Sequence, residues 1–124
     1  MKQLNEKEVA MQVEQFLDRA RALEPIQFSE LMALIEQYYD YSPTAFSNGG
    51  LQNAEDQNQG SCKLLAFAKL HQLTVEQTLN LFGDFYHLEV VGDPKGEAHG
   101  NIRAFMQTGW EGVCFDSEPL RLRG

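Results

Sequence analysis

The fold of this 124-residue chain is decided by the stretch Ser61-Cys62-Lys63-Leu64-Leu65-Ala66-Phe67-Ala68-Lys69-Leu70-His71. A helix at a protein surface carries its apolar residues in one stripe, whereas this stretch is apolar on nearly every side. We therefore expect a buried central helix over residues 61–71. The chain has the length of one domain, 1–124, packed around that helix.

Amphipathic patterns on both sides of this stretch predict the surrounding helices. Asn5 and Glu8 have capping-box spacing at the start of an apolar stripe that ends before Pro25. Thr74 and Gln77 form a second capping box. Further helices are expected over residues 28–39, 74–92 and 101–107, with a single helical turn over 42–46.

Together these elements predict a mainly α fold, a compact bundle of about five helices around the buried central one. Residues 48–60 are rich in Asn, Gln and Gly and predict a long, ordered polar loop with Leu51 as its apolar anchor. Val113–Phe115 is the candidate for at most one short strand or hairpin near the C-terminus. Residues 117–124 are expected to form a flexible tail.

The charge pattern argues against two classes of partner. The net charge is −8, and no lysine or arginine occurs between Arg21 and Lys63. An acidic surface repels phosphate backbones and anionic lipids, and no segment approaches the roughly 20 apolar residues that span a bilayer. We therefore expect neither nucleic acid nor membrane as a partner.

Cysteine usage and the N-terminal residues predict a cytoplasmic location. Cys62 and Cys114 are too few for a disulfide framework and are typical of free thiols in a reducing compartment. The first residues contain no apolar run followed by a cleavage site, so no signal peptide is expected.

Several short blocks occur in an order that is similar to one protein family. They are Asn48-Gly49, Asn58-Gln59-Gly60-Ser61-Cys62-Lys63, His99-Gly100-Asn101-Ile102-Arg103 and Gly109-Trp110-Glu111-Gly112-Val113. The chain resembles the HopJ family over roughly residues 28–116. The resemblance implies an uncharacterised bacterial protein, and it implies no catalytic residue.

The HopJ family takes its name from type III secretion effectors, so the resemblance also implies a secreted, effector-like alternative. Such effectors typically begin with a flexible, serine-rich and acid-poor segment. Here a capped helix with Glu6 and Glu8 begins at once. This departure favours a cytosolic relative.

The first candidate site is catalytic. Cys62 is expected at the start of a helix, where the helix dipole lowers the pKa of a thiol. Gln59 precedes it as an oxyanion-hole donor does in papain-like proteases, with His99 or His71 as the base. Asn101 or Asp84 would orient that base. The alternative is that Cys62 is a small buried core residue.

The second candidate is a binding module, which we favour. The loop and helix start over residues 48–63 would hold a small polar or anionic ligand, or a protein partner. The alternative is structural, with amides that cross-brace the loop, Arg103 holding the tail and Trp110 in the core. A third hypothesis for the function of the chain is a purely structural interaction protein, with the acidic first half of the chain as its surface. The candidate ligand-binding residues are Asn48, Asn53, Asn58, Gln59, Ser61, Lys63, Asn101, Arg103, Trp110 and Glu111.

No cofactor or metal is expected from the sequence. His71, His87 and His99 lack the spacing of metal ligands, and the chain has no Cys-x-x-Cys. The aromatic run Tyr38-Tyr39-Asp40-Tyr41 is more than one helix can bury inward, so a homo-oligomer is among the possibilities.

Overall fold

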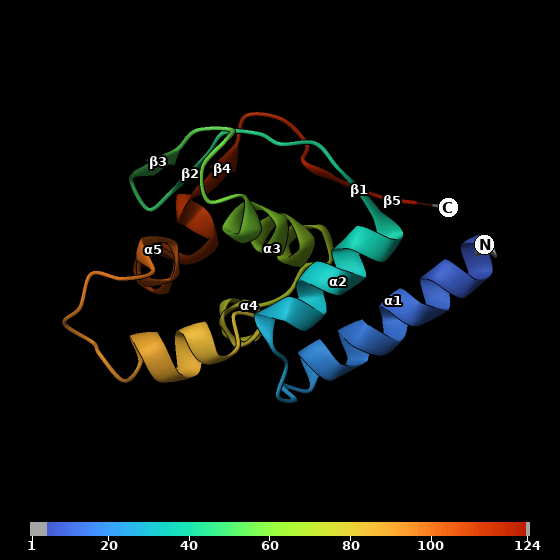
Figure 1. The fold of residues 1–124 in the computed structure, drawn as a ribbon, viewed down its shortest axis with the longest axis horizontal. Helices are drawn as coiled ribbons and strands as arrows, with labels where there is room; N and C mark the ends of the chain where they lie inside the picture. Colours follow the sequence, from blue (N-terminus) through green and yellow to red (C-terminus); the bar gives the residue numbers. More distant parts are fainter. Residues whose placement is uncertain (1–4, 124) are drawn as a thin grey trace.

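The computed structural model describes residues 5–123 and contains helices and strands in mixed order (Figure 1). The elements are α1 (Glu6–Arg21), α2 (Phe28–Tyr38), β1 (Tyr39–Tyr41), β2 (Phe46–Asn48), β3 (Leu51–Asn53), α3 (Gln59–Leu70), α4 (Val75–Asn80), the π-helical segment η1 (Phe85–Val90), α5 (Gly100–Thr108), the 3-10 turn η2 (Gly109–Gly112), β4 (Val113–Phe115) and β5 (Leu120–Leu122).

Helix α3 lies at the centre, with the strands on one side and α2 and α4 against it (Figure 1). Its buried residues are Cys62, Leu64, Leu65, Ala66, Phe67 and Ala68. The helix is buried on most of its sides because the strands cover one side and α2 and α4 pack against it elsewhere. This burial agrees with its apolar composition. The observed bounds, Gln59–Leu70, begin two residues and end one residue before those expected.

The prediction of a mainly α bundle with at most one strand or hairpin is wrong. Among residues 5–123 the chain forms two antiparallel sheets, one of β1 and β5 and one in the order β3-β2-β4. Each strand is only three residues long, so none shows the repeated alternation by which a strand is predicted. The single turn expected over 42–46 is likewise replaced by extended chain leading into β2.

The two sheets continue one another through a shared register. Tyr39 pairs with Leu122 in the first sheet. In the second sheet Phe46, seven residues after Tyr39, pairs with Phe115, seven residues before Leu122. Two backbone hydrogen bonds bridge the interval: Ser42 N–H donates to the Pro119 carbonyl at 2.8 Å, and Asp116 N–H donates to the Ala45 carbonyl at 3.0 Å. Residues 39–48 and 113–122 therefore form one interrupted antiparallel ribbon.

Residues 117–124, expected as a flexible tail, contain strand β5. Leu120 is buried in the core, and Arg123 Nε donates to Asp40 Oδ1 at 2.8 Å. The tail thus supplies one strand of the ribbon.

The helix expected over residues 74–92 is divided at Gly83. Thr74 caps α4 as predicted, its side chain accepting a hydrogen bond from Gln77 N–H. Gly83 has φ +61°, and a Cβ there would lie 2.9 Å from both Gln27 Cα and the Ile26 carbonyl oxygen. The chain turns at this glycine and continues as η1.

Replacing Gly83 with alanine is expected to lower the free energy of unfolding by about 1–3 kcal/mol, because both the left-handed backbone and the contact with residues 26–27 penalise a Cβ. Urea denaturation followed by the fluorescence of Trp110 measures this. Gly50, with φ +89° and nothing within 4 Å of its Cβ position, is the control that isolates the backbone contribution. Equal losses at both glycines would contradict a role for the close contact.

Candidate functional site

A cavity of about 440 Å³ lies where the first turns of α3 and α5 meet. Its walls are mainly apolar, with a few polar groups between them. The lining residues are Phe28, Leu51, Asn58, Gly60, Ser61, Phe82, Phe85, His99, Gly100, Asn101 and Ile102. We call this the helix-start cavity.

Two helix N-termini border this cavity. The residues that precede them, Asn58 and His99, both have left-handed backbones, with φ +50° and +58°, and neither caps its helix with its side chain. In α3 the Asn58 carbonyl accepts from Cys62 N–H, so the N–H groups of residues 59–61 come before the first helical hydrogen bond. Each helix start therefore presents backbone donors and the positive end of its dipole.

Four amide side chains, three of them buried and that of Asn58 exposed, join the two helix starts. Asn48 Nδ2 donates to the backbone carbonyl of Asn101 at 2.8 Å and to its side-chain Oδ1 at 3.0 Å. Asn101 Nδ2 donates to Asn53 Oδ1 at 3.0 Å, and Asn58 Nδ2 donates to the same oxygen at 2.7 Å. We call these four residues the amide cluster. It holds the β2–β3 hairpin and the start of α3 against the start of α5.

The amide cluster changes the roles expected for its members. Asn48 and Asn53 are buried behind the cavity and brace the loop, as the structural alternative predicted, whereas Asn58 and Asn101 also line the cavity. Leu51, expected as the buried anchor of the loop, is 40% exposed, so that expectation is wrong. The β2–β3 hairpin is anchored by amides because the side chains of Asn48 on β2 and Asn53 on β3 are buried.

His99 is held at the edge of the cavity by a carboxylate. Its Nε2 lies 2.8 Å from Glu89 Oε1, and its ring lies 5.3 Å from the ring of Phe85. The side chain of His99 is 27% exposed. Partners on η1 thus orient the imidazole, whereas the backbone of His99 immediately precedes α5.

Cys62 lies apart from this cavity. Its side chain is fully buried, and Sγ lies 4.0 Å from the Thr44 carbonyl oxygen. Burial raises the pKa of the Cys62 thiol, against smaller lowering effects of Tyr41, the Thr44 carbonyl and Lys63. This direction is opposite to what an activated nucleophile requires. The cavity lining includes His99 but not Cys62.

The other residues of the proposed catalytic group have structural partners. Gln59 Oε1 accepts a hydrogen bond from the Tyr41 hydroxyl, and Gln59 Nε2 donates to the Gln57 carbonyl at 2.7 Å. Lys63 Nζ lies 4.9 Å from the centre of the Tyr41 ring. These contacts place Gln59 and Lys63 around Tyr41 rather than around an open site.

His71 and His87 are also engaged in packing. His71 Nε2 lies 2.6 Å from the Tyr39 hydroxyl, and burial, with a further contribution from Arg21, lowers the pKa of His71. His87 Nε2 lies 2.8 Å from Asn80 Oδ1. Within residues 5–123, no three His, Cys, Asp or Glu side chains gather as metal ligands would.

Arg103, Trp110 and Glu111 lie outside the helix-start cavity. Arg103 donates from Nε to the Ala98 carbonyl at 2.6 Å and from Nη1 to the Asp93 carbonyl at 2.9 Å. Trp110 Nε1 donates to the Leu73 carbonyl at 2.9 Å. Arg103 therefore fixes the loop before α5, and Trp110 joins η2 to the chain after α3, while Glu111 is exposed.

The aromatic wall of the cavity was missed as part of a site. Phe28 and Phe82 are stacked with ring centres 6.2 Å apart, and Phe28 meets Phe85 edge to face at 5.6 Å. Phe82 is buried in the core, whereas Phe85, three residues later, is 40% exposed. The break at Gly83 turns Phe85 toward the cavity, and no periodic pattern anticipates that break.

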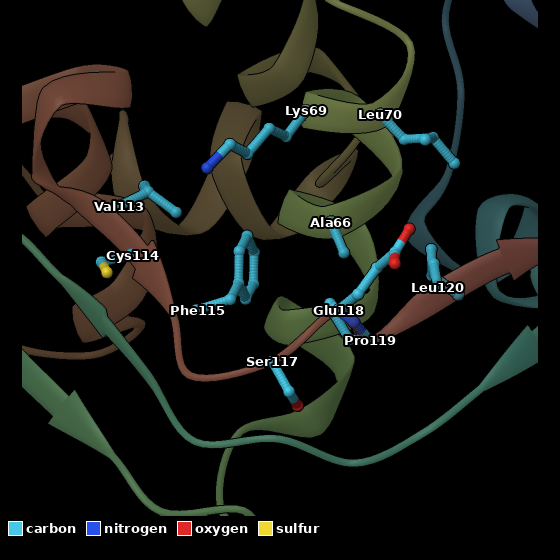
Figure 2. Close-up of a pocket in the computed structure, with 10 residues that line it drawn as sticks. All are labelled: Ala66, Lys69, Leu70, Val113, Cys114, Phe115, Ser117, Glu118, Pro119 and Leu120. Atoms are coloured by element: carbon cyan, nitrogen blue, oxygen red, sulfur yellow. The ribbon is translucent and has the colours of Figure 1, made fainter.

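A second cavity, of about 350 Å³, lies beside the later turns of α3 (Figure 2). It is bordered by Ala66, Lys69 and Leu70 of α3 and by the segment 113–120. We call it the ribbon groove. None of the candidate binding residues predicted from the sequence lies in it.

The comparisons identify one protein family and one similar solved structure. The model of the family described as HopJ type III effector protein matches residues 13–120. A crystal structure of the unknown function protein VPA0580 is similar, with 46% sequence identity, a TM-score of 0.86, and coverage of 89% of this chain and 92% of that chain. No curated protein matches the sequence. Over residues 5–123, none of the helices has the length and apolar character to cross a bilayer.

Proposed function

The chain belongs to the HopJ type III effector protein family, and from its helix-start cavity we propose that the domain binds a small molecule with an apolar ring and a carboxylate or similar anionic group. The observation that carries this proposal is the meeting of two uncapped helix starts and an aromatic wall in one cavity. The proposal concerns the folded domain, whether it acts inside the cell or after export.

The anionic group would be held by backbone donors. The N–H groups of residues 59–61 in α3 and of residues 100–101 in α5 come before the first helical hydrogen bond, and each helix dipole adds partial positive charge. None of the described residues that line the cavity is an aspartate or a glutamate. Glu89, the carboxylate at the cavity edge, is engaged with His99, so the lining itself favours an anion although the net charge of the chain is −8.

The ring would be held by the apolar wall. Phe28, Phe82 and Phe85 form one side of the cavity, and Ile102 lies on α5. Ligand pockets typically combine apolar walls with a few convergent polar groups, which is the composition found here. Ser61 and Asn58 would supply side-chain hydrogen bonds at the rim.

Benzoate is a suitable probe because it carries one ring and one carboxylate. We expect it to shift the amide NMR signals of Gly60, Ser61, Gly100 and Asn101 in a saturable manner. Benzamide, which has the same shape without the charge, should bind about tenfold more weakly, since hydrogen bonds to a charged acceptor are the stronger ones. Equal affinities, or shifts away from the two helix starts, would count against the proposal.

Replacing Gly100 with aspartate is expected to weaken benzoate binding by at least about tenfold. A Cβ at Gly100 meets only Leu51 Cδ1, at 3.4 Å, so a side chain fits at the edge of the cavity. An aspartate there competes with the ligand for the dipole of α5 and repels its carboxylate.

The matched control is Gly100→Asn, which has the same shape without the charge and should change the affinity by less than about threefold. Neither variant should lose stability, because a Cβ at Gly100 meets only Leu51 Cδ1, at 3.4 Å, and glycine is itself unfavourable within a helix. If both variants weaken binding equally, steric blockage and not charge explains the effect, and the anionic part of the proposal fails.

A further inference from the structure

We propose that the outer edge of β4 binds an extended peptide by strand addition, with the peptide lying in the ribbon groove between β4 and α3. This surface shares no lining residue with the helix-start cavity and is independent of it. The proposal rests on three features that occur together: a strand edge at Phe115 that no described strand pairs, an apolar groove beside it, and two opposite charges at its ends.

The backbone of β4 offers hydrogen-bonding groups on its outer side. Gly112 accepts from Gly49, and Asp116 donates to Ala45, so residues 112, 114 and 116 face β2. Neighbouring residues of a strand point their backbone groups to opposite edges, and Phe115 therefore directs its N–H and C=O away from β2. In the sheet order β3-β2-β4, no further described strand lies beyond β4.

The ribbon groove lies beside this edge. Figure 2 shows Phe115 pointing into the groove, with Ala66, Lys69 and Leu70 on the α3 side. Successive side chains of a strand alternate between faces, so an added strand would place every second side chain on this apolar surface. Peptides bound in this way gain affinity from main-chain hydrogen bonds and specificity from such alternate contacts.

Charges at the two ends of the groove define the partner further. Lys69 Nζ lies 5.6 Å from the centre of the Phe115 ring, and Figure 2 shows it on the Val113 side, whereas Glu118 lies on the Leu120 side. Neither Lys69 nor Glu118 takes part in an ion pair with another residue of the range 5–123. The partner is therefore an extended segment with apolar alternate residues, an acidic residue near Lys69 and a basic residue near Glu118.

The probe is a short synthetic peptide, blocked at both ends, that begins with arginine, alternates valine with serine and ends with aspartate. Running antiparallel to β4, it places its arginine at Glu118 and its aspartate at Lys69. We expect saturable NMR shifts at Ala66 and Leu70 and at least about tenfold slower hydrogen exchange of the Phe115 amide when the peptide is bound. The control peptide has the same side chains with every backbone nitrogen between its end residues methylated, which removes its N–H donors.

Two exposed charges test the assignment without threatening the fold. Lys69→Glu and Glu118→Lys should each weaken the peptide by roughly five- to tenfold, and a peptide with its end charges exchanged should recover affinity for the double variant. Failure of the wild-type protein to bind, equal binding of the methylated peptide, or shifts at Gly60 and Gly100 would each overturn the proposal. If neither Lys69→Glu nor Glu118→Lys changes the affinity for the peptide, the charges assigned to the partner are wrong.

Discussion

Replacing Asn101 with alanine is expected to lower the free energy of unfolding by about 2–4 kcal/mol, because it leaves buried amides without partners. Asn101 is 7% exposed. Its Oδ1 accepts from Asn48 at 3.0 Å and from Asn53 at 3.3 Å, and its Nδ2 donates to Asn53 at 3.0 Å. Alanine removes all three bonds at once, and the cavity that remains is small and enclosed by polar groups.

Urea denaturation of the two proteins measures this loss, with Asn58→Gly as the control. Asn58 is exposed, donates a single hydrogen bond of this cluster, and has a φ of +50° that glycine adopts easily. We expect the control to lose less than about 1 kcal/mol. A similar small loss for Asn101→Ala would mean that water replaces the missing amide and that the amide cluster is not what joins the two helix starts.

The fold was predictable where its cause is local. The side chain of Asn5 accepts from Glu8 N–H, and Thr74 and Gln77 form the expected capping box, because a cap needs only residues three apart. The pairings of β1 with β5 and of β2 with β4 join residues more than 60 positions apart, as Phe46 and Phe115 illustrate. A three-residue strand is too short for its alternation of apolar and polar residues to predict such a partner, so the mixed architecture was missed.

The candidate site was predictable in part for the same reason. Four residues proposed from their types and positions, Asn58, Ser61, His99 and Asn101, line one cavity although some 40 positions separate the two groups. Cys62, expected at a helix start as the nucleophile of the catalytic alternative, is buried and does not line this cavity, because the sequence indicates a helix start but not which residues of the first turn face solvent. The aromatic wall depends on the turn at Gly83 and on the meeting of α2 with the segment after α4, which are tertiary features.

Replacing Phe67 with alanine is expected to lower the free energy of unfolding by about 3–5 kcal/mol, the range observed when a fully buried aromatic side chain is removed. Phe67 is fully buried in α3, and its ring packs edge to face on Phe16 at 5.8 Å and on Tyr39 at 5.7 Å. It therefore connects α1, α3 and the ribbon, and nothing nearby is free to fill the space that it leaves. Thermal and urea denaturation measure the loss.

Phe85→Ala is the matched comparison, because it removes the same side chain from the wall of the helix-start cavity. Phe85 is 40% exposed and contacts Phe28 and His99. Its loss should cost less than about 1.5 kcal/mol of stability and weaken benzoate binding by roughly five- to tenfold, since it removes apolar contact from the ligand rather than from the core. If Phe85→Ala instead destabilised the protein as much as Phe67→Ala and left benzoate affinity unchanged in the folded fraction, Phe85 would be a core residue. The wall of the cavity would then be a consequence of packing and not a binding surface.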